Sequence, residues 1–232
     1  MLLAVMPLSV LRSWWLPPRT SPDAALILAA RGIRAFTDGY VALLLPYYLT
    51  LLGYSALQVG LIATATLLGS GLLTLLTGLF AYRFRMHVML TAACLLMLGT
   101  GLGFAAVTDF WPLLLIAVVG TLNPSSGDVS VFSPLEQSLL SHAAAAEWRT
   151  ALFARYSLVG HLLGALGALG AAIPGLLEQW SVLDLKTATQ AMFVVYGLSG
   201  LVALVLYRRL ASAGSRGDEV RAVPLGPSRG IV

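Results

Sequence analysis

Charged side chains interrupt long apolar stretches of this 232-residue chain at a few places. Arg34 and Asp38 stand four residues apart in the first stretch, Asp128 and Glu136 stand in the fourth, and Arg155 stands in the fifth. A charge inside a membrane is unfavourable by about 2.5–3.5 kcal/mol on insertion scales, so such residues are candidates for function by default. The chemistry open to them is proton uptake, ion pairing and the binding of a polar solute.

The spacing of these residues gives hypotheses about their partners. Arg34 and Asp38 share one helical face, so we expect either a local ion pair or a proton-sensitive carboxylate that faces a central cavity. Glu136 and Arg155 lie at similar depth, so we expect a buried pair that is either static or opens and closes as the protein works. Asp128 is expected either to face the cavity or to be a buried structural partner.

Polar groups near these charges are candidates to contact a solute. Tyr40 closely follows Asp38, although aromatic residues in such stretches are more often packed or lipid-facing. Asn123 and Ser126 belong to a polar segment around Pro124, where a kink is expected because proline removes a helical hydrogen bond. Freed backbone groups at that depth are tolerated only beside protein or water. Tyr40, Asn123 and Ser126 are therefore candidates to line a pathway.

The elements that must position these residues are membrane-spanning helices. Hydrophobic residues make up 58% of the chain and charged residues 10%, whereas a soluble domain has about 25% charged residues. This composition excludes soluble, disordered and disulfide-stapled classes. A bilayer core needs roughly 20 apolar residues per helix. We predict an all-α integral membrane protein with six transmembrane helices, at about 33–52, 56–80, 88–107, 111–140, 151–177 and 188–207.

Glycines recur through the fifth stretch, at positions 160, 164, 167 and 170. Gly160 and Gly164 form a small-xxx-small pair, which lets the backbones of neighbouring helices approach closely. We interpret these glycines as packing residues.

Basic residues predict the orientation and the domain limits. With the N-terminus in the cytoplasm, all 13 Arg lie on the inner side or at inner helix ends, and Lys186 alone lies outside. We therefore predict a cytoplasmic or interfacial segment over 1–30, a bundle over 31–210 and a cytoplasmic linker over 211–232. The preference for Arg over Lys is typical of a GC-rich bacterial genome, so the predicted location is a bacterial plasma membrane with both termini inside.

Other functional classes find little support in the residues. The chain has no phosphate-binding loop, paired cysteine motif, nucleophile elbow or zinc-protease motif, and Cys94 is its one cysteine. We therefore predict no cofactor, no metal and no enzymatic activity. No basic patch is interleaved with aromatics, so nucleic acid is not an expected partner. A membrane enzyme built on carboxylates such as Asp128 and Glu136 is the main enzymatic alternative.

Two short segments resemble the N-terminal six-helix half of the major facilitator superfamily. Residues 53–60 are similar to the tight first outer link of that family, and residues 78–85 are similar to its signature loop. The resemblance implies an inner gate at Gly78, Arg83 and Arg85. Tyr82 stands where the family has an Asp that pairs with Arg, so this gate is expected to be held differently.

The resemblance implies two six-helix halves joined by a cytoplasmic loop, with a solute site near the membrane midplane between them. We therefore expect a secondary active transporter of a small solute, working by alternating access, with protons as the candidate coupling ion. Residues 211–232 are interpreted as a linker truncated before a second bundle. The expected partners are the solute, the lipid bilayer, and the missing C-terminal half or a second copy. The alternatives are a self-contained homodimeric carrier, a non-transporting membrane enzyme or an assembly subunit.

Overall fold

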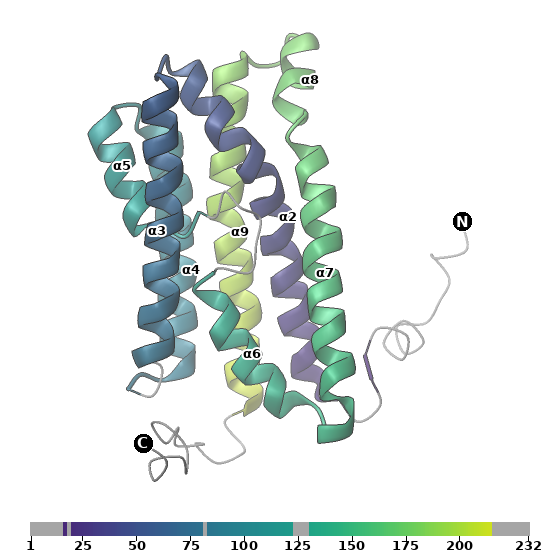
Figure 1. Cartoon of the computed structure of the whole chain (residues 1–232). Helices are drawn as coiled ribbons and strands as arrows, with labels where there is room; N and C mark the ends of the chain where they lie inside the picture. The colour runs from purple at the N-terminus through teal and green to yellow at the C-terminus, as the bar shows by residue number, and fades with distance from the viewer. Residues whose placement is uncertain (1–15, 18–19, 81–82, 123–129, 215–232) are drawn as a thin grey trace.

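The computed structural model describes residues 16–17, 20–80, 83–122 and 130–214, and these residues form a bundle of helices (Figure 1). Within this part of the chain the β contacts are limited to an isolated antiparallel bridge between Thr20 and Ala144. The predicted all-α class is confirmed. The longest helices run side by side along the molecule, and α2 begins at the same end of the bundle at which α9 ends (Figure 1).

Helix α2 (Pro22–Leu51) begins well before the apolar run that predicted it. The hydroxyl of Ser21 accepts the backbone N–H of Asp23 at 3.2 Å, and Pro22 occupies the first helical position. Serine is a preferred N-cap, and a proline there loses no helical hydrogen bond. Because α2 has 30 residues, Asp38 lies near its middle.

Helix α3 (Ala56–Phe80) begins at the short link that the sequence predicts. The N–H of Ser55 donates to the side-chain oxygen of Gln58 at 3.0 Å, and the N–H of Gln58 donates to the Ser55 hydroxyl at 3.4 Å. This reciprocal pair is a capping box. Gly53 before it has φ of +85°, which glycine adopts without a steric penalty. Ser55 therefore caps the start of α3.

The fourth predicted span is divided into two short helices that follow α4 (Met86–Ala106). Helix α5 (Phe110–Val119) ends before Gly120, and helix α6 (Phe132–Ala143) begins beyond the polar segment. The predicted interruption of this span is therefore confirmed. The proline at its centre lies outside the described residues.

The fifth predicted span is also divided. A single turn η1 (Ala146–Trp148) leads into α7 (Arg149–Gly170), and α8 (Ile173–Gln179) follows after a turn. Pro174 lies in the first turn of α8, where its missing N–H is tolerated. The last helix, α9 (Leu185–Gly214), contains the sixth predicted span.

Length and composition support an integral membrane protein. Helix α2 is long enough to cross a membrane, but it carries several charges along its length. Helix α5 is apolar and short. The predicted count of six spans therefore stays a prediction, while the all-α membrane class stands. Within the described ranges, four segments qualify as spans by length and composition: Ala56–Phe80, Met86–Ala106, Ala146–Gln179 and Leu185–Leu210.

Glycines at several positions allow neighbouring helices to pack with their backbones in close contact. A Cβ atom on Gly39 of α2 would lie 2.1 Å from the carbonyl oxygen of Gly164 in α7, and one on Gly167 would lie 1.9 Å from the carbonyl oxygen of Phe36. A Cβ atom on Gly101 of α4 would lie 2.5 Å from a backbone nitrogen of α9. Small residues permit such close approach of helices in membranes. The packing interpretation is thus confirmed for Gly164 and Gly167.

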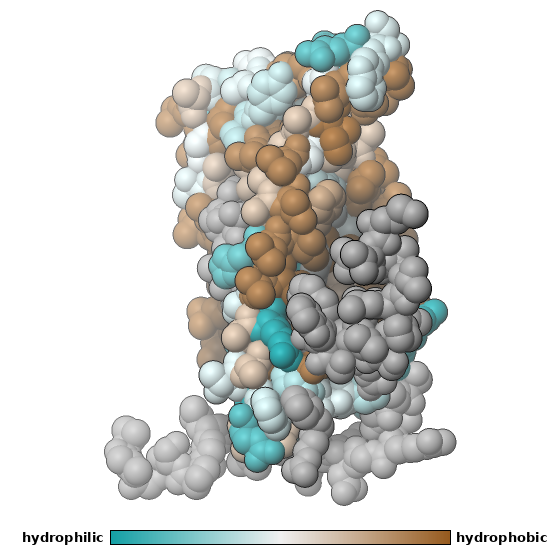
Figure 2. Space-filling view, turned by 90° about the vertical axis from the view of Figure 1, so that its right-hand side faces the viewer, coloured by the Kyte–Doolittle hydropathy of each residue, from teal (hydrophilic) through white to brown (hydrophobic). Residues whose placement is uncertain are grey.

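The outer surface of the bundle is apolar. In Figure 2, hydrophobic side chains gather over the middle of the visible face, and hydrophilic residues lie more toward its two ends. Leu158, Leu162, Leu166 and Leu169 recur along α7 and are each at least half exposed. This surface is suited to contact with lipid.

Candidate functional site

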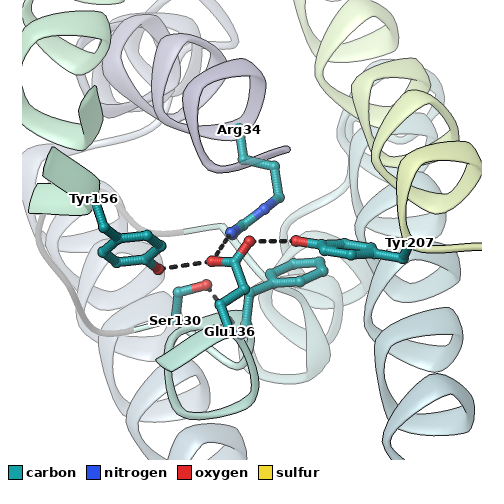
Figure 3. Close-up of polar contacts among 6 residues, drawn as sticks. Arg34, Ser130, Glu136, Tyr156 and Tyr207 are labelled. Atoms are coloured by element: carbon teal, nitrogen blue, oxygen red, sulfur yellow. Dashed lines mark hydrogen bonds and ion pairs between the residues drawn. The ribbon is translucent and has the colours of Figure 1, made fainter. Parts of the chain in front are cut away.

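A buried carboxylate connects four helices of the bundle. Glu136 of α6 is fully buried, and its oxygens accept three hydrogen bonds (Figure 3). Its Oε2 accepts from Nη2 of Arg34 in α2 at 2.5 Å and from the Tyr156 hydroxyl of α7 at 2.6 Å. Its Oε1 accepts from the Tyr207 hydroxyl of α9 at 2.5 Å. We call these four residues the Glu136 cluster.

An aromatic ring supports the cluster. The guanidinium carbon of Arg34 lies 4.0 Å from the centre of the Phe132 ring, one turn before Glu136 on α6. The Phe132 and Tyr207 rings are stacked, with centroids 6.2 Å apart. A cation over a ring face is stabilised by the ring quadrupole, more so when both groups are desolvated. Phe132 thus holds the Arg34 and Tyr207 side chains in the positions from which they donate.

A second arginine lies beside the cluster. The guanidinium of Arg31 lies 5.1 Å from the centre of the Tyr156 ring, and the side chain is buried. On α7, a Cβ atom at Gly160 would lie 2.7 Å from Nε of Arg31. Gly160 therefore makes room for this guanidinium, which any larger residue would crowd.

The cluster places a charge pair where both side chains are almost completely buried. An ion pair in such a place is stable only if the remaining hydrogen-bonding capacity is satisfied, because both ions lose their hydration. The two tyrosine hydroxyls provide this for Glu136. Arg34 is less completely satisfied, because its buried Nε has no hydrogen-bond acceptor among the described residues.

The partners differ from those that spacing predicts. Arg34 pairs with Glu136, so the predicted local pair between Arg34 and Asp38 is wrong. The predicted pair between Arg155 and Glu136 is also wrong, since Nη1 of Arg155 is buried without an acceptor in the described part of the chain. Both predictions failed because spacing and depth do not specify which donors and acceptors the other helices bring to each charge.

Asp38 lies apart from the Glu136 cluster. Its side chain is half-buried near the middle of α2. Among the described residues no hydrogen bond or ion pair reaches its carboxylate. Arg34 and Arg31 are near enough to act on it electrostatically, as is Glu136 with opposite sign.

Further polar contacts join α2 to α9. The buried Tyr40 donates to the carbonyl oxygen of Met192 at 3.0 Å. The Thr37 and Ser199 hydroxyls lie 3.2 Å apart, and the Gln190 amide donates to the Tyr48 hydroxyl at 3.1 Å. In this structure Tyr40 serves as a link between these two helices.

The remaining predicted site residues lie elsewhere. Asn123, Ser126 and Asp128 fall outside the described residues. Gly78 lies near the end of α3, and open space surrounds the position of a Cβ there. Arg83 and Arg85 are exposed in the link between α3 and α4, and Arg85 stands at the N-cap position of α4. The loop is thus separate from the Glu136 cluster in sequence and in burial.

Sequence reasoning missed Tyr207 of the Glu136 cluster and the neighbouring Arg31. Arg31 precedes Arg34 by three residues, a spacing that places both on one helical face. This signal was available in the sequence. Tyr207 closes the last apolar run, and nothing in its neighbourhood indicates a partner in α6.

One shallow groove of about 460 Å³ lies between α2, α7 and α9. Its lining includes Phe36, Leu163 and Val202, and it carries no charged residue. It is suited to an acyl chain of the bilayer rather than to a polar solute. Among the described residues, no group of three His, Cys, Asp or Glu comes together in a way that could hold a metal ion.

The helical fold, the apolar surface and the intramembrane ion pair together define a polytopic membrane protein with a buried polar site. The family model of the Major Facilitator Superfamily matches residues 27–228, so the chain belongs to this superfamily. Membership indicates a membrane transporter in general terms.

A curated relative extends the comparison. An uncharacterized membrane protein of Saccharomyces cerevisiae is 28% identical over 149 residues, which is 64% of this chain and 33% of the yeast protein. The chain therefore spans about a third of the length of this relative. No solved structure matches the chain.

Proposed function

We propose that the chain forms the N-terminal six-helix half of a secondary transporter, which moves a small solute by alternating access and couples this movement to protons. The observation that carries the proposal is the Glu136 cluster. An ion pair inside a membrane is retained against an energetic penalty, and such pairs mark solute and proton pathways. Superfamily membership supports the transporter class.

In this proposal the charged residues share two tasks. The carboxylates of Asp38, Asp128 and Glu136 are the candidates for proton coupling, and Arg34 and Arg155 supply positive charge beside the pathway. Solute contacts are assigned to Tyr40, Asn123 and Ser126, and the inner gate to Gly78, Arg83 and Arg85.

The proposed orientation places both ends of the bundle, residues 31–210, on the cytoplasmic side. Helix α2 begins and α9 ends at the same end of the molecule, as an even number of crossings requires (Figure 1). The concentration of Arg at inner helix ends supports the same orientation. The Arg-rich composition supports a bacterial plasma membrane.

A solute site between two halves needs a second bundle. We propose that this bundle is a C-terminal half that follows residues 211–232, which would then form the linker. The greater length of the yeast relative supports this arrangement. A second copy of the chain, forming a homodimeric carrier, is the alternative source.

The proposal is tested in vesicles that contain the purified chain and a trapped pH-sensitive dye. Sugars, carboxylates, amino acids and quaternary ammonium ions are added outside in turn, with and without an imposed pH gradient. The same assay is run on a version extended through the downstream reading frame. We expect one solute class to drive proton movement that protein-free vesicles do not show.

The outcomes separate the alternatives. Activity of the extended version alone supports the half-transporter, whereas activity of the short chain supports a homodimeric carrier. If neither version moves solute or protons, the transporter proposal is wrong, and a membrane enzyme or an assembly subunit becomes the better hypothesis.

A further inference from the structure

The groove between α2, α7 and α9 is separate from the Glu136 cluster. Phe36 of α2 lines the groove, whereas Arg34 of the cluster lies two positions earlier on the same helix. An α-helix turns by about 100° per residue, so these two side chains leave α2 on nearly opposite sides. The groove therefore opens on a different face of α2 from the one that carries the ion pair.

The lining of the groove is suited to a hydrocarbon chain. Val195, Leu198 and Val202 form its α9 wall, and each is about half exposed. The hydroxyls of Thr37 and Ser199 donate to carbonyl oxygens one turn earlier in their own helices, at 2.9 and 2.7 Å. The hydroxyls in the lining are therefore already satisfied, and an acyl chain there would gain van der Waals contacts without burying an unpaired polar group.

Arg155 lies on the same side of α7 as the groove. Leu163 lines the groove, and both Leu163 and Val159 approach the position of a Cβ atom on Gly32 of α2, at 2.5 and 3.3 Å. Arg155, Val159 and Leu163 follow one another at four-residue intervals, and such positions lie one above another on a helix. Arg155 therefore stands two turns from Leu163, about 12 Å nearer to the start of α7.

Arg155 has no anionic partner in the described part of the chain. Its side chain is half-buried, and its buried Nη1 has no acceptor there. A guanidinium that loses its hydration is unfavourable unless an anion compensates its charge. An anion from the surroundings of the protein would supply this compensation.

The depth of Arg155 matches that of a lipid phosphate. The exposed leucines of α7 begin at Leu158, three positions after Arg155, and continue to Leu169. The hydrocarbon core thus borders α7 from about Leu158 onward, which leaves Arg155 at the level of the headgroups. Half of a bilayer core is about 15 Å thick. One acyl chain of a lipid whose phosphate lies beside Arg155 therefore reaches past Leu163 and into the groove.

We propose that the groove and Arg155 form a binding site for an anionic phospholipid of the surrounding bilayer, with one acyl chain in the groove and the phosphate paired with Arg155. The inference goes beyond the proposed function, because it concerns a bound lipid and not the transported solute. A headgroup with net negative charge is favoured over a zwitterionic one, since Arg155 has no counter-ion among the described residues. The bound lipid would join α2, α7 and α9 along their common surface.

The experiment is native mass spectrometry of the full chain, titrated in detergent with phosphatidylglycerol or phosphatidylcholine of identical acyl chains. The ratio of lipid-bound to lipid-free protein gives the dissociation constant of the first bound lipid. We expect phosphatidylglycerol to bind more tightly than phosphatidylcholine. Arg155→Gln should weaken the binding of phosphatidylglycerol roughly fivefold, which is the contribution of one basic residue near an anionic lipid surface, and should weaken that of phosphatidylcholine less.

Two further variants test the role of the charge. Arg155→Lys keeps the positive charge and should retain the preference for phosphatidylglycerol. Lys186→Gln is the matched control, because it removes one positive charge near the start of α9, at the opposite end of the bundle from the start of α7 (Figure 1). It should leave the binding of both lipids unchanged.

Val202→Trp tests the groove independently of Arg155. Val202 is 48% exposed, so a larger side chain is tolerated there and occupies the space of the acyl chain. Both lipids should bind several-fold more weakly. Val205→Trp is the matched control, because Val205 is 52% exposed on the same helix and lies outside the lining of the groove.

The outcomes test the two parts of the site separately. Equal affinity for the two lipids, or a loss in Lys186→Gln as large as that in Arg155→Gln, overturns the pairing of the phosphate with Arg155. Unchanged binding in Val202→Trp overturns the placement of the acyl chain. Glycerophosphoglycerol, which has the headgroup without acyl chains, should not displace phosphatidylglycerol at equal concentration. Displacement by it would show that the groove contributes nothing.

Discussion

The α2–α7 interface and the attachment of α6 join helices in opposite ways. Between α2 and α7, Gly39 and Gly167 bring two backbones into direct contact. Helix α6 has only 12 residues, and its Leu135 and Leu140 are buried. The carbonyl of Ala143 at its end accepts the N–H of Ser21 before α2, and the side-chain hydrogen bonds described between α6 and the helices α2, α7 and α9 converge on Glu136. The first interface depends on the absence of side chains, and the second depends largely on one charged side chain.

This difference indicates which contacts between helices can rearrange and which cannot. Two backbones in direct contact are closely packed, so they leave no space for an added Cβ atom and little freedom to rearrange. A hydrogen-bonded ion pair can exchange partners when a nearby charge appears or disappears. We therefore regard α2–α7 as a rigid pair and the Glu136 cluster as the part that can rearrange.

The largest effect is expected from Gly39→Ala, which breaks the rigid interface. The added Cβ would lie 2.1 Å from the backbone oxygen of Gly164, which cannot turn aside as a side chain can. Overpacking usually destabilises by about 1–3 kcal/mol and occasionally by more. Because two backbones must move apart here, we expect a loss that exceeds the roughly 3–5 kcal/mol typical of a broken buried ion pair. Thermal unfolding in detergent measures the loss. Gly71→Ala is the matched control, because among the described residues no atom beyond the local backbone of its own helix lies within 4 Å of its Cβ position.

A smaller but still large effect is expected from Glu136→Ala, which removes the polar attachment. The change leaves Arg34 buried without its counter-ion, and breaking a buried pair in this way destabilises by about 3–5 kcal/mol. The double variant Arg34→Met with Glu136→Leu should recover most of the loss in the same unfolding assay. If Glu136→Ala is as stable as the original protein, the attachment of α6 does not depend on the cluster.

Tyr207→Phe sharpens the comparison by removing one tie of α6 and leaving its charge pair intact. Hydrogen bonds to charged groups contribute about 1.5–3 kcal/mol, and we expect a loss in this range. Tyr47→Phe serves as the control, since Tyr47 is 45% exposed. Equal unfolding temperatures for the two variants would show that the Tyr207 hydroxyl contributes nothing.

The smallest effect is expected at Asp184, where a similar polar bond lies in water. The N–H of Thr187 donates to Asp184 at 3.0 Å, and hydrogen bonds from Thr187 hold the pKa of this carboxyl below its ordinary value. Stabilisation of the α9 start is therefore complete above about pH 4 and is lost as the pH falls through the lowered pKa. Amide exchange at Thr187 measures this.

Two variants distinguish the N-cap hydrogen bond of Asp184 from the negative charge of its carboxylate. Asp184→Asn should keep the protection of the Thr187 amide, measured as the exchange rate relative to that of an unstructured peptide at the same pH, without the dependence of this protection on pH, because Asn is also a good N-cap. Asp184→Ala should speed exchange at every pH. A pH dependence that survives in Asp184→Asn would assign it to another group.

The sequence predicted the local features of this protein well. The short link before α3 and the divided fourth span follow from short-range chemistry, since turns and breaks depend on residues a few positions apart. Arg34, Asp38 and Glu136 stood out because charges are rare in apolar runs. The bounds of α2 were harder to predict, because Ser21 and Pro22 start the helix outside the apolar run.

The composition and order of residues by themselves determined the membrane environment and the places where charge enters it. They did not determine which charges meet. Arg34 selects Glu136, which lies 102 positions away, over Asp38 on its own helix. Tyr156 and Tyr207 join from two further helices. Only the tertiary structure decided this, because the strength of an ion pair depends on how far its surroundings exclude water and on which donors other helices bring to it.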